Sequence, residues 1–114
     1  MSDTPAILKA ADELGKLIAD HPATQKFDAV LKKLKDDTEA QRLVTDLNRH
    51  RETLAEKQSA GKPIEVDDKR KLESLQQAVA SHAVLRDLQM AEMDYVDLMR
   101  KVDDRLRAAG EPGR

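Results

Sequence analysis

The stretch HAVLRDLQMAEMDYVDLMRKVDDRLRA, residues 82–108, decides the fold of this chain. It contains no glycine and no proline, and its apolar residues recur at intervals of three or four positions. This spacing predicts one α-helix with the apolar residues on a single face. We call this face the apolar stripe, and it consists of Val84, Leu88, Ala91, Tyr95, Leu98 and Val102.

The length of this helix predicts self-association. At about 1.5 Å per residue it would be roughly 40 Å long, whereas a compact domain of this size has a radius of gyration of about 13 Å. The helix would therefore extend beyond the body of its own subunit. We expect a second copy of the chain to cover the apolar stripe, so that the protein forms a dimer or a larger assembly.

The composition predicts an all-α protein. Of the 114 residues, 37% are charged and only 2% are aromatic. Aliphatic side chains among so many charges are typical of amphipathic helices rather than of strands. The length suits one domain. We predict a single helical domain over residues 1–109 and a disordered tail over residues 110–114.

The composition also excludes several classes of partner and cofactor. The net charge of −2 lacks the basic surplus of a general nucleic-acid binder. The chain has no cysteine, which excludes disulfides and thiolate-bound metals. No apolar run approaches the ~20 residues of a membrane span, and the start, MSDTPAILKAAD, does not resemble a secretory signal. We expect a cytoplasmic protein without a cofactor.

Four shorter helices are predicted before the last one, over residues 5–19, 22–35, 38–60 and 68–80. Thr4, Asp67 and Ser81 are the predicted caps of the first, fourth and last helices, and Asp36-Asp37 is predicted to cap the third. The segment Gly61-Lys62-Pro63 is predicted to end the third helix. The expected architecture is a bundle of antiparallel helical hairpins with a long C-terminal helix.

Four short motifs follow one another along the chain. They are residues 11–14 (ADEL) with Ile18, residues 37–43 (DTEAQRL), residues 58–61 (QSAG) and residues 91–92 (AE). In their order and spacing, from about residue 6 to residue 106, they resemble the YlbF/YmcA family of small helical bacterial proteins, which includes YheA.

The resemblance implies a YheA-like helical fold, self-association and a regulatory role without catalysis. Members of the family act with partner proteins in competence, biofilm formation and sporulation, and in directing RNA processing by a membrane-bound ribonuclease. The implied partners are a second copy, other regulatory proteins of the same family, or an RNA-processing enzyme. Some members are associated with an iron–sulfur cluster through cysteines, and this feature does not transfer to a chain without cysteine.

No catalytic or metal-binding arrangement is visible in the sequence. His21, His50 and His82 are too far apart along the chain to form a helical metal pair. The carboxylates of residues 82–108 are expected to form a solvated face, with the pairs Asp97–Lys101 and Asp103–Arg107 one turn apart. We therefore expect no catalytic residue and no enzymatic activity.

Polar residues interrupt the apolar face of the third helix. Arg51 and Gln58 fall on this face, His50 lies at its edge, and Glu92 flanks the apolar stripe. We predict that Arg51, Gln58 and Glu92 are buried, with Arg51 paired to Glu92 and Gln58 bonded to backbone near Gly61-Lys62-Pro63. Alternatively, Arg51 lays its stem on the core and extends its charged head into water.

The side of the last helix opposite the apolar stripe carries Met90 and Met93, with Arg86 and Asp97 beside them. Because methionine side chains are flexible and polarisable, they suit adaptable interfaces. We predict that these four residues form a surface for a partner protein. The alternative is that the two methionines are ordinary exposed apolar residues.

Taken together, these features predict a non-enzymatic protein that works through protein–protein interaction. It would be an adaptor that recruits or restrains an enzyme, or a structural oligomer. A small RNA-associated protein is the alternative class, with basic clusters at residues 32–35 and 69–71. Both clusters adjoin carboxylates, and neither has aromatic neighbours that could stack on bases.

Overall fold

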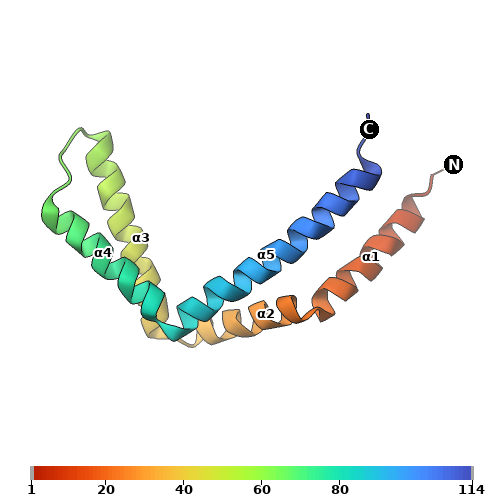
Figure 1. Ribbon diagram of the computed structural model, residues 1–114, viewed down its shortest axis with the longest axis horizontal. Coiled ribbons are helices and arrows are strands. Elements are labelled where there is room, and N and C mark those ends of the chain that lie inside the picture. The colour runs from red at the N-terminus through yellow and green to blue at the C-terminus, as the bar shows by residue number, and fades with distance from the viewer. Residues whose placement is uncertain (1, 114) are drawn as a thin grey trace. The chain divides into compact units, whose positions relative to one another are not determined.

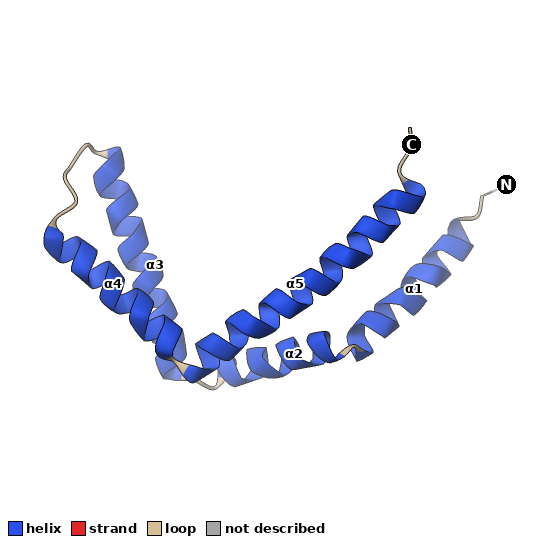
Figure 2. Ribbon diagram, viewed as in Figure 1, coloured by secondary structure: helices blue, strands red, loops and turns tan. Residues whose placement is uncertain are grey.

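The computed structural model describes residues 2–113, and within this range the chain is all-α, as predicted (Figure 1). Figure 2 shows the helices joined by short loops, with no strand in the described part of the chain. The helices are α1 (Thr4–Asp20), α2 (Pro22–Lys35), α3 (Thr38–Ser59), α4 (Val66–Ser81) and α5 (Ala83–Gly110). No helix within residues 2–113 is both long enough and apolar enough to span a membrane.

Contacts divide the chain into two compact units. Unit 1 contains α1, the first part of α2 and α5 from Met90 onward, and unit 2 contains α3, α4, the end of α2 and the start of α5 as far as Gln89. The single domain over residues 1–109 stays a prediction. So does the disordered tail, whose first residue, Gly110, is the last of α5 and whose last residue, Arg114, lies outside the described range.

Unit 2 is built on the antiparallel hairpin of α3 and α4. Its buried apolar residues are Val30, Ala40, Leu47 and Leu85. Because Ala40 and Leu47 are seven positions apart, both lie on one face of α3, and this face packs inward. The hairpin therefore forms as the helical periodicity predicts.

The turn between α3 and α4 follows the predicted glycine stop. Gly61 has a φ of 71°, which a residue without Cβ adopts without strain. Its N–H donates to the Gln58 carbonyl at 3.1 Å, and the Lys62 N–H donates to the Lys57 carbonyl at 2.8 Å. This pair of bonds is a Schellman motif, which satisfies the last carbonyls of α3.

Of the four predicted caps, only Asp37 is in its predicted role, with its side chain accepting from the Ala40 N–H at 2.9 Å. The prediction of Thr4 was wrong, since the residue before α1 is Asp3. Asp67 was also wrong, because α4 begins at Val66 and the carboxylate of Asp68 accepts from the Glu65 N–H at 3.0 Å.

Ser81 was the third wrong cap, because it is the last residue of α4. His82 occupies the junction instead. Its N–H donates to the Ala78 carbonyl at 3.1 Å, and its carbonyl accepts from the Arg86 N–H at 2.9 Å. One residue thus ends α4 and begins the hydrogen-bond pattern of α5.

Unit 1 is organised along α5 from Met90 onward, and the whole of α5 has 28 residues and is about 42 Å long. The Phe27 ring of α2 packs on the Tyr95 ring with centroids 5.2 Å apart. Ala91 is 1% exposed, and the other five residues of the apolar stripe are half-buried. Much of the stripe therefore packs within its own chain and does not by itself require a second one. Its role in self-association stays a prediction.

Candidate interaction surfaces

Helix α1 carries an uncovered apolar surface in unit 1. Ile7, Leu14 and Ile18 lie on one line along the helix, with Leu8 on one side and Leu17 on the other. No residue of α1 is buried, and Leu17 is 71% exposed. We call these five residues the apolar arc. Such a wide apolar face is expected to be covered in the assembled protein.

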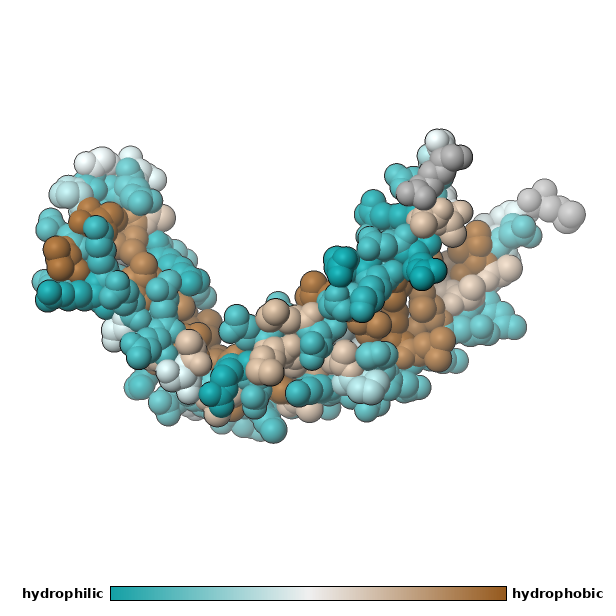
Figure 3. All heavy atoms as spheres, in the orientation of Figure 1, coloured by the Kyte–Doolittle hydropathy of each residue, from teal (hydrophilic) through white to brown (hydrophobic). Residues whose placement is uncertain are grey.

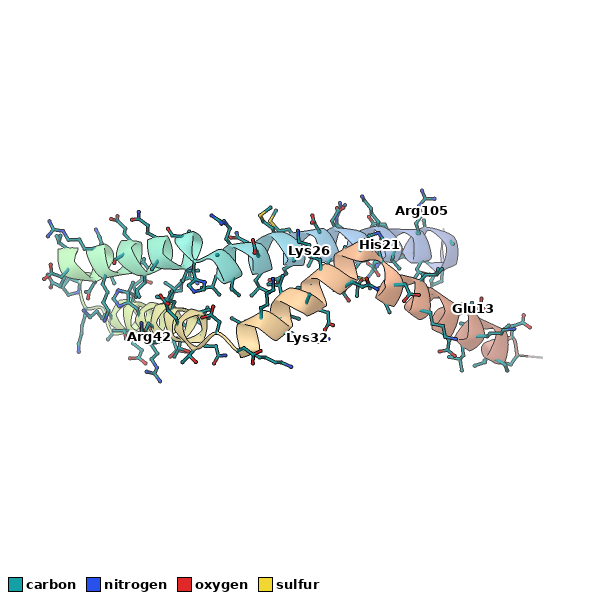
Figure 4. The ribbon with its side chains drawn as sticks, turned by 90° about the horizontal axis from the view of Figure 1, so that it is seen from below. Glu13, His21, Lys26, Lys32, Arg42 and Arg105 are labelled. Carbon is teal, nitrogen blue, oxygen red and sulfur yellow. The ribbon has the colours of Figure 1, made fainter. Side chains whose placement is uncertain are left out.

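The joint between α1 and α2 determines where α1 lies in unit 1. The His21 Nδ1 accepts from the Ala23 N–H at 3.0 Å and satisfies a free donor at the start of α2. Figure 4 shows His21 and Lys26 close to α5, whereas Glu13 lies on the part of α1 that diverges from α5. The α1 helix therefore contacts α5 near this joint and separates from it towards its N-terminus.

An open groove of about 350 Å³ lies between α1 and α5. We call it the α1–α5 groove, and it is lined by Leu14, Lys101, Val102, Arg105 and Leu106. Figure 3 shows apolar side chains gathered over α1 and the facing side of α5. The two charged residues of the lining are both basic, so the groove combines an apolar floor with a positive edge.

Charges near this groove are not all paired within the chain. The Lys101 Nζ lies 3.0 Å from an oxygen of Asp97. Arg105 and Glu13 are exposed, and within residues 2–113 neither forms an ion pair or a side-chain hydrogen bond. The predicted pairs Asp97–Lys101 and Asp103–Arg107 are confirmed, the latter at 2.8 Å.

The opposite side of α5 carries a second exposed apolar patch. Met90, Met93 and Val96 are all more than half exposed, and we call them the methionine face. Val96 was missing from the predicted partner surface, although its position three residues after Met93 places it beside that residue. Exposure of Met90 and Met93 is what a docking surface requires, and the binding of a partner there stays a prediction.

Asp97, also in the predicted partner surface, takes part in a charge network. Its carboxylate lies 2.7 Å from the Arg100 guanidinium as well as 3.0 Å from Lys101. Hydrogen bonds from Lys101 and then Arg100 hold the pKa of Asp97 below its ordinary value. Arg86 is exposed. The methionine face thus has a charged network at its C-terminal end.

Unit 2 contains a polar groove between α3 and α4. His50 is 6% exposed, and its Nε2 hydrogen-bonds to the Asp68 carbonyl at 2.8 Å. The Lys57 Nζ lies 2.6 Å from the Asp68 carboxylate. The hydrogen bond from Lys57, followed by that from the Glu65 backbone, lowers the pKa of Asp68. We assign this network a structural role, because its bonds join the two helices of the hairpin.

The prediction that Arg51, Gln58 and Glu92 are buried was wrong for the single chain, and the exposed Arg51 agrees with the alternative in which its charged head extends into water. Arg51, Gln58 and Glu92 are exposed in the single chain, and His50 is the buried polar side chain of α3. His50 and Arg51 follow Leu47 by three and four positions, so both lie near its direction. His50 is the one that faces α4, where it bonds to the Asp68 carbonyl. Arg51 and Glu92 belong to different units, and their ion pair stays a prediction.

The three histidines have separate local environments. The His82 Nε2 lies 3.6 Å from the Asp37 carboxylate, and both residues belong to unit 2. His21 is in the α1–α2 joint, and His50 is inside the α3–α4 hairpin. Within residues 2–113, no group of three histidine, cysteine, aspartate or glutamate side chains is arranged to hold a metal ion.

Comparison with known proteins identifies the family. A family model described as "Control of competence regulator ComK, YlbF/YmcA" matches residues 7–109. No curated protein sequence matches the chain. The fold is similar to that in the crystal structure of Bacillus subtilis RicA in complex with RicF, with a TM-score of 0.79 and 20% identity over 91% of this chain and 92% of that one. This chain belongs to the YlbF/YmcA family.

Proposed function

We propose that this protein is a non-enzymatic regulatory adaptor of the cytoplasm that binds other proteins and copies of itself. The description of the family concerns control of a competence regulator, and the similar solved structure is a complex of two proteins. Both support a role exercised through protein contacts. A related helical protein or an RNA-processing enzyme is the kind of partner we propose.

The surplus of exposed surface is the observation that carries this proposal. The chain exposes 9063 Å², whereas a compact monomer of 12.8 kDa would expose about 6,300 Å². Even two separate compact bodies of half that mass would expose only about 7,600 Å² together. The surplus of roughly 1,500 Å² includes exposed apolar residues of α1 and α5. A surface larger than compact folding would leave, with exposed apolar side chains on it, is typical of proteins that function in complexes.

The methionine face provides the direct test. The double variant Met90→Glu, Met93→Glu places two charges on an exposed face, so the fold should persist while a partner bound there is lost. The matched control is Val66→Glu, Gln76→Glu on α4, where Val66 is 62% exposed. Partners retained by the tagged wild-type protein in its native cell would be identified and purified. Their affinity for each variant, and their activity with and without this protein, would then be measured.

Three results would contradict the proposal. One is that no purified partner binds the wild-type protein. Another is that every partner binds without any change in its activity or localisation. The third is retention that depends on RNA, disappears after ribonuclease treatment and falls steeply with salt. That last result would favour the RNA-associated alternative.

A further inference from the structure

We propose that the groove between α3 and α4 of unit 2 binds a short extended segment of a partner protein that carries an acidic side chain. This inference rests on the proposed function, because it gives the adaptor a second contact with other proteins and names the chemistry of the bound segment. We call this site the α3–α4 groove. It has a volume of about 490 Å³ and is lined on α3 by Asp46, Arg49, His50 and Thr53 and on α4 by residues that include Lys71 and Leu75.

The bonds that hold the hairpin together leave most of the charges of this groove unused. The His50 imidazole and the Asp68 carboxylate are both engaged in bonds between the two helices. The side chains of Arg49, Lys71 and the half-buried Asp46 form no ion pair and no hydrogen bond within residues 2–113. These three charges therefore contribute nothing to the contact between α3 and α4, and they are available to a ligand.

The two walls of the groove each carry a positive charge. Arg49 belongs to α3 and Lys71 to α4, and both side chains are exposed. A carboxylate that lies between the helices is attracted by both, and an arginine can bind it through two parallel hydrogen bonds. The ligand therefore carries an acidic group.

The α3 wall also requires hydrogen-bond donors from the ligand. A carbonyl can only accept, so the His50 Nε2 that bonds to the Asp68 carbonyl carries the proton of the neutral imidazole. The Nδ1 is then an acceptor, and it is neither bonded nor enclosed within residues 2–113. The Asp46 carboxylate, one turn earlier on α3, is a second acceptor. The backbone N–H groups of a peptide supply such donors.

The length of the groove suits a few extended residues. Asp46, His50 and Thr53 lie along one line of α3, and the distance along the helix from the first to the last is about 10 Å. An extended chain covers this distance in about three residues, at ~3.3 Å each. A short segment thus reaches the acceptors of α3 while its acidic side chain lies between the two cations.

The same lining disfavours other kinds of occupant. Small-molecule sites are mostly apolar, whereas Leu75 is the one apolar residue among those described in the lining of this groove. A nucleic-acid backbone has phosphates but no N–H donor for the acceptors of α3, and no aromatic residue is among the described residues of the lining to stack on a base. A peptide segment matches both the acceptors and the cations.

The first experiment selects random heptapeptides displayed on phage against the immobilised full-length protein. Peptides eluted from the wild type should be enriched in acidic residues, and most should be lost on Lys71→Glu. The matched control is Lys69→Glu, a charge reversal at an exposed position of α4 outside the groove, which should retain them. Failure to enrich acidic peptides, or equal retention by the two variants, would overturn the inference.

The second experiment measures the affinity of a selected peptide by fluorescence anisotropy of a labelled synthetic copy. Arg49→Ala and Lys71→Ala should each raise the dissociation constant about fivefold or more. A peptide in which lysine replaces the acidic residue should bind better to Lys71→Glu than to the wild type. Arg51→Ala, at an exposed position of α3 outside the groove, should change nothing. Loss of neither contact, or absence of the charge-swap rescue, would refute the assignment.

The Asp46 side chain distinguishes a specific contact from simple attraction between opposite charges. If Asp46 accepts peptide N–H groups, Asp46→Ala should weaken binding about threefold or more. Simple attraction has the opposite sign, because removing a negative charge strengthens the binding of an acidic peptide. Asp67→Ala removes an exposed carboxylate outside the groove and should leave the affinity unchanged. Far-UV circular dichroism checks the fold of each variant, and tighter binding by a folded Asp46→Ala would overturn the inference.

These outcomes separate the inference from the proposed function. Purified partners that bind the wild type in the absence of any selected acidic peptide, and that bind Lys71→Glu equally well, would overturn the groove contact and leave the adaptor role intact. Acidic peptides that bind as expected, without any partner whose activity changes, would support the groove and contradict the adaptor role. A uridine 12-mer that binds in a Lys71-dependent way while no peptide does would assign the groove to nucleic acid instead.

Discussion

The side chains of Lys57 and Asp68 meet at 2.6 Å and join the last turn of α3 to the first turn of α4. The same carboxylate accepts the Glu65 N–H and therefore also begins α4. The Asp68 side chain thus both joins α3 to α4 and stabilises the first turn of α4.

Replacing Asp68 should loosen the α3–α4 hairpin. Asp68→Asn removes the negative charge opposite Lys57 and weakens the hydrogen bond to Glu65. We expect a lower midpoint of thermal unfolding, measured by far-UV circular dichroism. The matched control is Asp67→Asn, one position away and exposed. Equal midpoints for the two variants would show that the contact contributes nothing.

The loss of stability at low pH should depend on the ionisation of the Asp68 carboxylate. The pKa of Asp68 is lowered in the folded chain, chiefly by the Lys57 hydrogen bond. Its contribution is therefore complete above the ordinary aspartate value and is lost as the pH falls through the lower folded pKa. Unfolding measured from about pH 6 to about pH 2 should show a steeper loss for the wild type than for Asp68→Asn. Parallel profiles would contradict this assignment.

Removing the buried imidazole of His50 should also destabilise unit 2. His50→Ala deletes the bond to the Asp68 carbonyl and leaves space in the hairpin. We expect a loss of roughly 2 kcal/mol in the free energy of unfolding by urea. His50→Leu keeps most of the volume and should lose about half as much. If both variants are as stable as the wild type, the hydrogen bond makes no net contribution to the free energy of unfolding.

The contact between the Phe27 and Tyr95 rings provides an optical signal for the packing of unit 1. The chain has one tyrosine and no tryptophan, so tyrosine fluorescence and the tyrosine band of the near-UV circular dichroism spectrum report on Tyr95 alone. Phe27→Ala should cost roughly 2 kcal/mol, because Phe27 is only half-buried. It should also weaken the near-UV signal. Phe27→Leu should retain more stability but lose the ring-dependent part of the signal, and an unchanged spectrum would place the rings apart in solution.

Two glycine substitutions should change the free energy of unfolding in opposite directions. Gly61→Ala forces a side chain into a φ of 71°, which costs about 1 kcal/mol although the surrounding space is open. Gly15 is within α1, and a Cβ there meets nothing within 4 Å. Gly15→Ala should therefore favour the helix by roughly 0.5–1 kcal/mol. Urea unfolding of both variants checks the signs, and a stabilised Gly61→Ala would contradict the Schellman turn.

The helices could be predicted because their causes are local. The spacing of Val84, Leu88 and Ala91 defines an amphipathic period within a few turns, and Gly61 marks a stop wherever it occurs. The caps at Thr4, Asp67 and Ser81 were wrong by one or two residues, because several residues suited to capping adjoin each other. Only the path of the backbone selects which side chain reaches a free N–H.

The burial of particular side chains depended on the fold. His50 is inside and Arg51 is outside, although the two are neighbours in the sequence. A rotation of about 100° per residue separates their directions, and the position of α4 decides which direction is the inner one.

The amino-acid sequence by itself determined the all-helical class, the family and the apolar face of each helix, because these follow from spacing along the chain. Only the tertiary structure decided what lies against each face. The apolar stripe of α5 is largely covered by its own chain, whereas α1 remains bare. A periodic pattern indicates that one face of a helix is apolar. Contact between segments distant in the sequence decides whether that face is buried.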